Sequence, residues 1–436
     1  MGNASESASG AVEVFQAGER SLCLHKARAL IEQAIDAAGL TARLTDQGGA
    51  WRCHLHRRGT PQVPVAMGGG KGESPTAQVG ALFEALEHYR SDSLPFRQGH
   101  VVLRSPVQLL AEEFVGDPAL AAVPADAAHT PLACRTHTAV DGSGSTLDVP
   151  VFIHHPSYLE LGPRRRQILV ADAFDYRPVG RYSTNSGTAI GADITEALVH
   201  ALAETIERDA YSLLLVATFL TRTPAPLRLV EHGSLPASLQ ALHDRAEQYL
   251  ADSVALIDMT TDLDVPAFCA HASARRGHLM QGYGASLSAE YAAQRALSEL
   301  MQVAAVAQEE DHPPPSLTHL EPHPRLLASA RADFAACLDT ARTTRFTPTD
   351  APATPHGHLR QLNEALARRG YRAYGHVLHT EPNGIVTLTV FTPGLERFFA
   401  VTKGACIVPG PRARTAKQRA PDTSRPTPRP QAGTAQ

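Results

Sequence analysis

The sequence predicts an α+β protein with mixed sheets, organised around three amphipathic helices. Three segments share one pattern: a glycine-rich approach, a polar helix cap, and an Ala/Leu-rich helix that carries acidic residues. Short stretches between these segments have the length and composition of strands. The segments are GGGKGES with ALFEALEH (residues 68–88), GTAIGAD with ALAETIER (187–208) and GYGASLS with ALSELMQ (282–302).

The first 180 residues predict one long helix before the first segment and short elements after it. Apolar residues on one side predict a helix over residues 21–38. In the first segment Ser74 is a suitable N-cap and Pro75 a suitable first helical residue. The predicted strands here are 51–57, 64–67 and 149–154, the helix of the first segment is 75–90, and basic residues 162–166 are predicted to be a loop.

The second half predicts alternating helices and strands around the second and third segments. The central helix begins near Asp193 and continues past Tyr211. Residues 311–324 are proline-rich and predict an exposed loop or a crossover. Further helices are predicted at 235–250 and 358–369, strands at 254–259, 266–271, 371–378 and 384–391, and a PGLE turn at 393–396.

Composition is that of an ordinary globular protein. The chain has 436 residues, 43% of them hydrophobic and 19% charged, with a net charge of −4. This charge gives no argument for nucleic-acid binding. No apolar run of membrane-spanning length and no signal peptide is present, and the six separated cysteines are typical of reduced thiols, so we expect a cytoplasmic protein. Residues 1–17 and the Pro-rich tail 412–436 are expected to be flexible, leaving one catalytic domain over 18–411.

The central helix concentrates charge on one face. At about 100° per residue, Glu196, Glu204, Glu207 and Arg208 fall within one arc, with His200 between them. Adjacent carboxylates repel one another unless cations lie among them, and Mg²⁺ shared with a substrate phosphate meets that need. Two alternatives stay open: a solvated acidic face, or a capping role for Glu196 opposite Asp193.

The first and third helices repeat this division into an apolar and a charged face. Glu84 and Glu87 share one face of the first helix, and Arg295, Glu299 and Gln302 share one face of the third. If the three helices converge, their carboxylates and arginines meet in a cleft suited to metal and phosphate. The cleft would differ from familiar nucleotide sites, because the sequence contains neither GxxxxGK[ST] nor GxGxxG.

On these motifs the sequence resembles the YcaO family over roughly residues 20–411. The resemblance implies the YcaO fold, with the three helices converging on a site for ATP and Mg²⁺. Glu204, Glu207, Arg208 and Arg295 would form the catalytic centre. By the same resemblance Glu84, Glu87, Glu204, Glu207 and Glu299 would hold Mg²⁺, while Lys71, Ser186, Glu196, Arg208, Arg295 and Gln302 would bind the nucleotide.

Three positions depart from the family pattern. Gly80 stands where a serine is usual, His88 where the first motif usually ends in arginine, and Ala304 where a second arginine often follows the third motif. One or two phosphate contacts of the family are therefore expected to be missing or replaced in this chain.

The resemblance implies ATP-dependent activation of peptide backbone amides. Within the family, the sequence is most similar to the cyclodehydratases that convert Cys, Ser or Thr of a ribosomally made precursor peptide to thiazoline or oxazoline, as in the biosynthesis of peptide antibiotics such as microcin B17. Thioamide formation is the first alternative, and a non-catalytic ATP-bound scaffold is the second. Azoline-forming members often end in PxPxP; residues 426–430 have this spacing, which is either functional or a chance feature of the tail.

The same resemblance implies partner proteins. No leader-binding domain is evident before Gly69, so we expect a separate E1-like or leader-recognition protein. An FMN-dependent azoline dehydrogenase and a homodimer within the complex are further expectations, whereas nucleic acid and membrane are not expected as partners.

Overall fold

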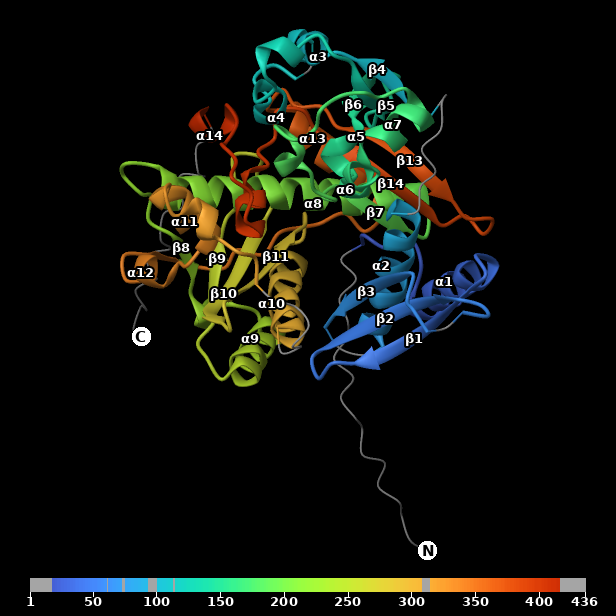
Figure 1. Ribbon diagram of the computed structural model, residues 1–436. Coiled ribbons are helices and arrows are strands. Elements are labelled where there is room, and N and C mark those ends of the chain that lie inside the picture. The colour runs from blue at the N-terminus through green and yellow to red at the C-terminus, as the bar shows by residue number, and fades with distance from the viewer. Residues whose placement is uncertain are drawn as a thin grey trace, which may run out of the picture.

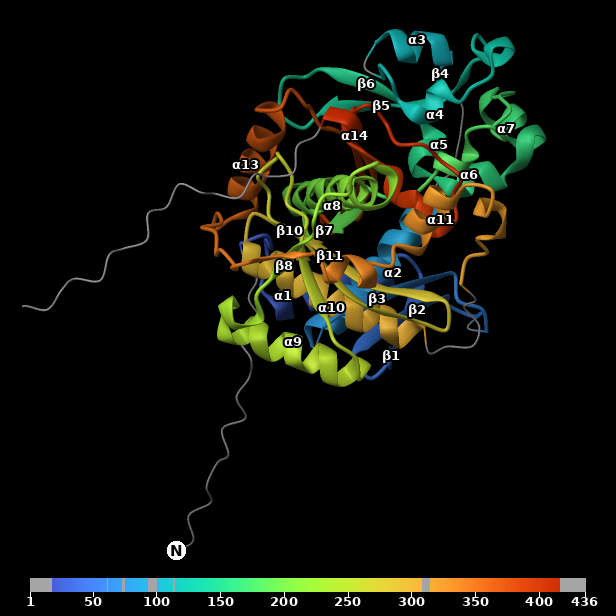
Figure 2. The ribbon, with the colours of Figure 1, turned by 90° about the vertical axis from the view of Figure 1, so that its left-hand side faces the viewer.

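The computed structural model describes residues 18–60, 62–72, 75–92, 100–112, 114–307 and 314–415. These residues form three sheets, of three, five and six strands, surrounded by helices (Figure 1). The long helix α8 (Ile194–Leu215) crosses the centre of the molecule, and Figure 2 shows the other elements arranged around it. The predicted α+β class is confirmed.

The first sheet is an antiparallel meander near the N-terminus. Its order is β1-β2-β3, and β1 and β2 are joined by a short turn. Cys53 and Leu55 of β2 point into the core, whereas His54 and His56 alternate with them on the other face. The strands are β1 (Leu40–Asp46), β2 (Ala50–Arg57) and β3 (Ala66–Lys71), and helices α1 (Leu24–Ala37) and α2 (Thr76–Asp92) pack with this sheet.

The second sheet has five strands. Its order is β11-β10-β9-β8-β12, and only the β8–β12 pair is parallel among the pairings of the described residues. Its strands are β8 (Arg228–Val230), β9 (Ala255–Asp258), β10 (Ala267–Arg275), β11 (His278–Ala285) and β12 (Arg342–Thr344), and helices α9 (Ala237–Leu250) and α10 (Ala289–Val306) share its core.

The six-stranded sheet is antiparallel throughout and joins distant parts of the chain. Its order is β4-β5-β13-β14-β7, with β6 paired to β5, so two C-terminal strands lie between strands from the middle of the sequence. The strands are β4 (Val102–Arg104), β5 (Leu132–Ala139), β6 (Thr146–Pro150), β7 (Thr188–Gly191), β13 (Tyr374–Thr380) and β14 (Val386–Phe391).

The remaining helices are mostly short. They are α3 (Pro106–Ala111), α4 (Pro118–Ala121), α5 (Val151–His154), α6 (Pro156–Glu160), α7 (Gly162–Val170), α11 (Pro324–Arg331), α12 (Ala335–Leu338), α13 (Pro355–Ala367) and α14 (Arg412–Thr415). The 3₁₀ helices are η1 (Ala125–Ala127), η2 (Gly180–Tyr182), η4 (His232–Ser234), η5 (Thr318–Leu320) and the longer η6 (Phe398–Lys403), and the π-helical turn η3 (Val216–Leu220) extends α8.

Each of the three glycine-rich segments is a strand that packs against the helix following it. A Cβ atom on Gly70 of β3 would lie 1.6 Å from the Ala77 carbonyl oxygen of α2, and one on Gly282 of β11 would lie 2.2 Å from the Ala296 carbonyl oxygen of α10. Glycine therefore lets the backbones of strand and helix approach closely. This contact explains why glycines and an Ala-rich helix occur together in all three segments.

Two secondary-structure predictions are wrong. The strand predicted at residues 149–154 ends at Pro150, and α5 begins directly after it. The loop predicted at 162–166 is the first part of α7, whose Pro163 is acceptable in the first helical turn and whose Arg166 is buried over the ring of Tyr176. Local composition favoured strand and loop, and tertiary packing overrode it.

Most other predicted elements agree with the structure within a few residues. Asp193 is the N-cap of α8, as predicted. Ser74 lies outside the described residues, as do residues 311–313 of the predicted loop 311–324; within 314–323 that loop contains only η5, and α11 starts at Pro324. The described chain continues past residue 411 through α14. Among the described residues no helix has the length and apolar character needed to cross a membrane.

Candidate active site

Helix α8 brings two glutamates and an arginine to the centre of the molecule. The Asp193 side chain accepts a hydrogen bond from the Glu196 backbone N–H at 2.9 Å, which fixes the start of the helix. From Ala197 onward, apolar residues along one side of α8 pack into the core. The opposite side presents Glu204, with a side chain 21% exposed, and Glu207, with a side chain 1% exposed.

The Glu207 carboxylate lies between two arginines without a close hydrogen bond from either. Its Oε1 is 3.7 Å from Arg208, and its Oε2 is 3.7 Å from Arg295 of α10. Oε2 is buried and has no hydrogen-bond partner in the structure. A buried carboxylate oxygen without a donor is costly unless another ligand binds it, so this oxygen is suited to a cation.

Lys71 and Glu299 connect the first and third segments. The Lys71 ammonium at the end of β3 donates to Glu299 Oε2 of α10 at 2.8 Å. The Tyr283 backbone N–H lies 3.4 Å from the same oxygen. Burial alone would raise the pKa of Glu299, but Lys71 and then Arg208 lower it below the usual value for a glutamate. Glu299 is therefore an anion held among cations.

Glu84 and Glu87 complete the group from α2. Burial raises the pKa of both carboxyl groups. The negative charges of Glu84, on the same helix, and of Glu204, on α8, raise the pKa of Glu87 further, so the carboxylates of α2 and α8 lie near one another. Burial also raises the pKa of Glu204, against the opposing effect of Arg208. Burial is the main cause of all three raised values, and the nearby cations offset it only in part.

Aromatic rings hold Arg208. Its guanidinium carbon lies 5.3 Å from the centre of the Tyr283 ring and 5.5 Å from that of the Phe399 ring. Its Nε is 3.6 Å from Glu204, longer than a normal hydrogen bond. The rings restrain the guanidinium while leaving its N–H donors without close acceptors, an arrangement suited to an anionic ligand.

Gln302 and Ser186 lie at the borders of this cluster. The Gln302 amide packs against Gly69, where a Cβ would come within 2.1 Å of its nitrogen. Ser186 lines a small cavity together with Arg208 and His154. The Ser186 carbonyl oxygen accepts a hydrogen bond from His154 Nδ1 at 2.8 Å, and burial lowers the pKa of His154 to about 4.

Glu196 has partners of its own. Arg20 donates to its Oε1 at 3.1 Å, and the Ser21 backbone N–H donates to its Oε2 at 2.9 Å. Glu196, the second residue of the predicted capping pair, thus binds Arg20 and Ser21 of the N-terminal segment to α8. No sequence pattern indicated Arg20 or Phe399 as neighbours of these residues, because both lie outside the three glycine-rich segments. Tyr283 lies inside the third segment, but the helical pattern of charged residues does not include it.

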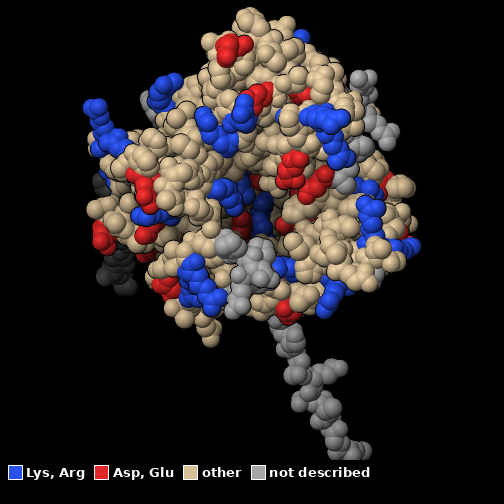
Figure 3. All heavy atoms as spheres, in the orientation of Figure 1, with Lys and Arg blue, Asp and Glu red and all other residues tan. Residues whose placement is uncertain are grey.

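The structure thus brings most of the predicted residues into one cluster. We call it the carboxylate cluster: Lys71, Glu84, Glu87, Glu204, Glu207, Arg208, Arg295 and Glu299. Gln302 and Ser186 border it, and Glu196 is joined to Arg20 instead. The face drawn in Figure 3 is hollowed near its centre, with acidic and basic atoms inside the hollow. The crowded carboxylates, the open Glu207 oxygen and the arginines fit Mg²⁺ with a phosphate ligand.

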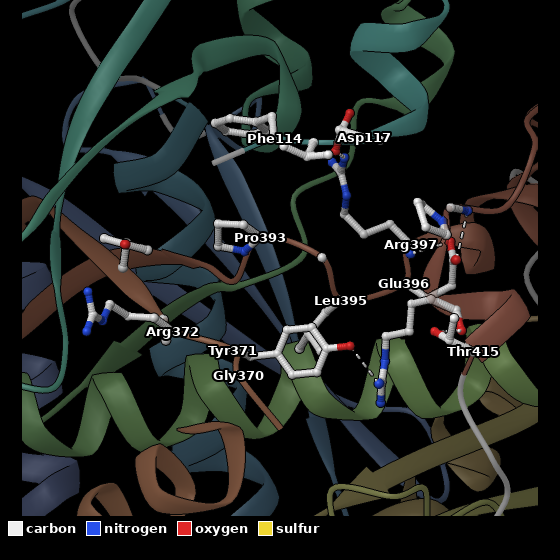
Figure 4. A pocket seen from close by; sticks show the side chains of 18 of the residues that line it. Phe114, Asp117, Gly370, Tyr371, Arg372, Pro393, Leu395, Glu396, Arg397 and Thr415 are labelled. Atoms are coloured by element: carbon white, nitrogen blue, oxygen red, sulfur yellow. Dashed lines mark hydrogen bonds and ion pairs between the residues drawn. The ribbon is translucent and has the colours of Figure 1, made fainter. Parts of the chain in front are cut away.

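A second cavity of about 580 Å³ lies beside the cluster, between the C-terminal segments and the α4 region (Figure 4). Phe114, Tyr371 and Leu395 supply apolar wall, and Arg397, which donates to Asp117 at 2.5 Å, supplies polar wall. Leu395, Glu396 and Arg397 line both this cavity and the small one that contains Arg208. The two spaces therefore share a wall formed by residues 395–397, which include the end of the PGLE turn.

Comparison with known proteins identifies a matching family. A family model described as YcaO cyclodehydratase, ATP- and Mg²⁺-binding, matches residues 69–396. A curated protein of Rhizobium leguminosarum bv. trifolii, described as an uncharacterized protein in the tfuA 3′ region, is 34% identical over 140 residues. That alignment covers 29% of this chain and 31% of the relative, so the chain spans about a third of the length of the curated relative.

Solved structures share the fold at low sequence identity. A YcaO protein of Methanopyrus kandleri, bound with AMPPCP and Mg²⁺, matches with a TM-score of 0.62 and 20% identity, covering 88% of this chain and 94% of that one. A heterocyclase in complex with substrate and cofactor gives 0.58 and 17%, covering 88% of this chain and 54% of that one. The E. coli microcin synthetase McbBCD complex gives 0.52 and 12%, covering 82% and 88%.

Proposed function

The chain belongs to the YcaO family, and we propose that it uses ATP to convert Cys, Ser or Thr residues of a ribosomally made precursor peptide to thiazoline or oxazoline. ATP and Mg²⁺, predicted from the sequence, are the ligands that the family description names. The observation that carries the proposal is the carboxylate cluster, in which three helices direct glutamates at one another between two arginines and a lysine.

The glutamates of the cluster are proposed to hold Mg²⁺. When bound, Mg²⁺ would neutralise charge on the phosphates of ATP and polarise them. The buried Glu207 oxygen without a donor supports this role. The raised pKa of Glu87 and Glu204 also supports it, because burial disfavours their anionic forms and a bound cation would favour them. Arg208 and Arg295 are proposed to orient phosphate oxygens, since their donors stay 3.6–3.7 Å from the glutamates.

The reaction that fits such a site transfers a phosphoryl group to an amide oxygen. The side-chain thiol or hydroxyl of the peptide adds to the preceding backbone carbonyl carbon and loses its proton. The resulting oxyanion takes the terminal phosphoryl group of ATP, and ADP leaves. The C–O bond then breaks, phosphate departs with the oxygen, and loss of the amide proton gives the C=N bond of the azoline. Positioning and charge neutralisation dominate this chemistry.

The 580 Å³ cavity is proposed to admit the peptide. Its walls combine aromatic and aliphatic side chains with charged groups, which suits an extended chain of mixed composition. Because residues 395–397 line both this cavity and the small cavity with Arg208, a peptide held there would approach the arginine end of the cluster. The neighbouring Arg397 and Tyr371 offer polar contacts to peptide carbonyls.

Partner proteins are part of the proposal. The similar microcin synthetase was solved as a complex of several proteins, and another similar heterocyclase was solved with its substrate. By analogy we propose that this chain works with a leader-recognition protein of the E1-like type and that a flavin dehydrogenase oxidises its products.

Phosphate release from ATP tests the proposal. The purified protein, its partner and precursor peptides rich in Cys, Ser and Thr should release phosphate only when peptide is present. The isosteric change Glu204→Gln should reduce turnover at least about 100-fold without unfolding the protein. The matched change Glu364→Gln, on the exposed face of α13, should leave turnover near the wild-type rate.

The intact mass of the product separates the alternatives. Loss of one water per modified residue supports azoline formation. Exchange of oxygen for sulfur, seen as a mass increase, would replace it with thioamide formation. Absence of ATP turnover with every peptide and partner, while Mg²⁺ and ATP still bind, would leave the scaffold alternative.

A further inference from the structure

A compact group of potential metal ligands lies outside the carboxylate cluster, where the turn η4 meets helix α9. His232 of η4 and His243 and Asp244 of α9 each offer one ligand atom, and these atoms lie within 4.8 Å of one another. Figure 1 shows α9 below the strands of the five-stranded sheet, away from α2. The proposed function uses none of these residues.

The protonation of His243 is fixed by its surroundings. Its side chain is buried, with the residue 6% exposed, and its Nε2 lies 2.9 Å from the Val254 carbonyl oxygen. A carbonyl oxygen only accepts hydrogen bonds, so Nε2 carries the hydrogen and Nδ1 keeps a free lone pair. Nδ1 is buried and has no hydrogen-bond partner in the structure. Metal-binding histidines use this arrangement, in which the second nitrogen donates to a carbonyl and orients the ring.

His232 and Asp244 supply the other two ligands from the solvent side. His232 Nε2 lies 2.8 Å from Asp244 Oδ1, and the rings of His232 and His243 are 4.9 Å apart between centroids. The side chains of His232 and Asp244 are 45% and 63% exposed, so an ion can enter and a water can complete its coordination. An ordinary surface ion pair would account for this contact, but it would leave the buried Nδ1 of His243 unexplained.

We propose that His232, His243 and Asp244 bind one Zn²⁺ ion, with water in the fourth position. Two imidazole nitrogens and one carboxylate oxygen form a ligand set suited to zinc, whereas Mg²⁺ and Ca²⁺ prefer oxygen ligands throughout. The ion would fasten η4 to α9 and thereby fix the connection between β8 and this helix.

Calorimetric titration with zinc chloride tests the site. The full chain, free of any affinity tag and stripped of metals, is titrated in the presence of saturating Mg²⁺ and a non-hydrolysable ATP analogue, so that the carboxylate cluster is occupied. We expect one Zn²⁺ per chain. His232→Ala and Asp244→Asn should each weaken zinc binding at least about 100-fold, because loss of an outer-shell partner alone costs about 10- to 100-fold. Glu231→Gln, a change of the neighbouring exposed acid, should leave the affinity unchanged.

Two further measurements keep the test independent of folding and of the proposed function. Co²⁺ bound to the wild-type chain should give the strong visible absorption of a tetrahedral site, and Asp244→Asn should abolish it. Zinc should raise the melting temperature of the wild-type chain but not of His232→Ala. Absence of zinc binding by the wild-type chain, or equal binding by the wild type and both ligand variants, would overturn the proposal.

Discussion

Lys71 and Glu299 are separated by 228 positions in the sequence, yet the Lys71 ammonium lies 2.8 Å from the Glu299 carboxylate. The pair joins the end of β3 to the middle of α10, so it ties the first glycine-rich segment to the third. Their side chains are 31% and 12% exposed, which limits but does not remove screening by solvent. The pair therefore contributes to the assembly of the site as well as to its charge.

Lys71→Met should destabilise the protein in the absence of nucleotide. Removing the ammonium leaves Glu299 among other carboxylates with less positive charge, and breaking a buried pair in this way costs about 3–5 kcal/mol, less for a partly exposed one. We expect a loss of about 2–3 kcal/mol in the free energy of unfolding, measured by urea denaturation without metals.

The double variant Lys71→Met/Glu299→Gln provides the control. It removes the unpaired charge along with the cation, so it should be more stable than Lys71→Met alone, which gives a coupling energy of at least about 1 kcal/mol. Additive losses would contradict the direct interaction.

Whether the sequence predicts a contact within the site depends on how many positions separate the two residues in the chain. Helical periodicity placed Glu204 with Glu207 and Glu84 with Glu87 on shared faces, because those spacings are local. The meeting of α2, α8 and α10 depends on how three sheets pack and came from the family resemblance. The contact of Arg20 with Glu196 could not be predicted, since it crosses 176 positions and belongs to no periodic pattern.

Gly282→Ala should disrupt the packing of β11 on α10. The added methyl would lie 2.2 Å from the Ala296 carbonyl oxygen and 2.2 Å from the Leu300 nitrogen, both backbone atoms. Strand and helix would have to separate, so we expect a loss of about 2–4 kcal/mol in thermal or chemical unfolding. Gly233→Ala is the matched control, because its methyl would meet no atom within 4 Å, and its stability should stay within about 1 kcal/mol of the wild type. Equal losses in both variants would contradict the close-approach explanation.

The glycines also show which part of the fold the sequence does not predict. A glycine-rich approach followed by a helix was recognised three times, but composition does not distinguish a turn from a strand that needs glycine for close packing. Only the position of the Ala77 and Ala296 backbone atoms next to Gly70 and Gly282 decides between them. Likewise, α7 contains residues that suit a loop, yet it is helical and its Arg166 is buried.

Stability of the metal-free protein should depend on pH through Glu87. Burial and the neighbouring carboxylates raise the folded-state pKa of Glu87 well above its usual value. Between the usual and the raised pKa the folded chain binds more protons than the unfolded chain, so stability falls as pH rises through this window. Glu87→Gln removes that contribution. The variant should match the wild type below the usual carboxyl pKa and exceed it in stability at neutral pH.

Urea denaturation over a series of pH values, without divalent ions, measures this difference. Adding Mg²⁺ with a non-hydrolysable ATP analogue at neutral pH should reverse the order, because a ligand that binds only the folded wild type stabilises it. A constant difference between Glu87→Gln and the wild type at all pH values would contradict the raised pKa.

Arg412 should be required for the stability of α8, although it lies in the segment expected to be flexible. Its guanidinium donates to both oxygens of Asp209 at 2.6 and 2.9 Å and to Asp262 at 2.8 Å. Asp209 is fully buried and adjoins Arg208, so Arg412→Met would leave an unpaired charge beside the carboxylate cluster. We expect a loss of about 3–5 kcal/mol in the free energy of unfolding, measured by urea denaturation. The exposed Arg414→Met is the matched control and should change stability by less than about 0.5 kcal/mol. If both variants were as stable as the wild type, the Asp209–Arg412 pair would have no such role.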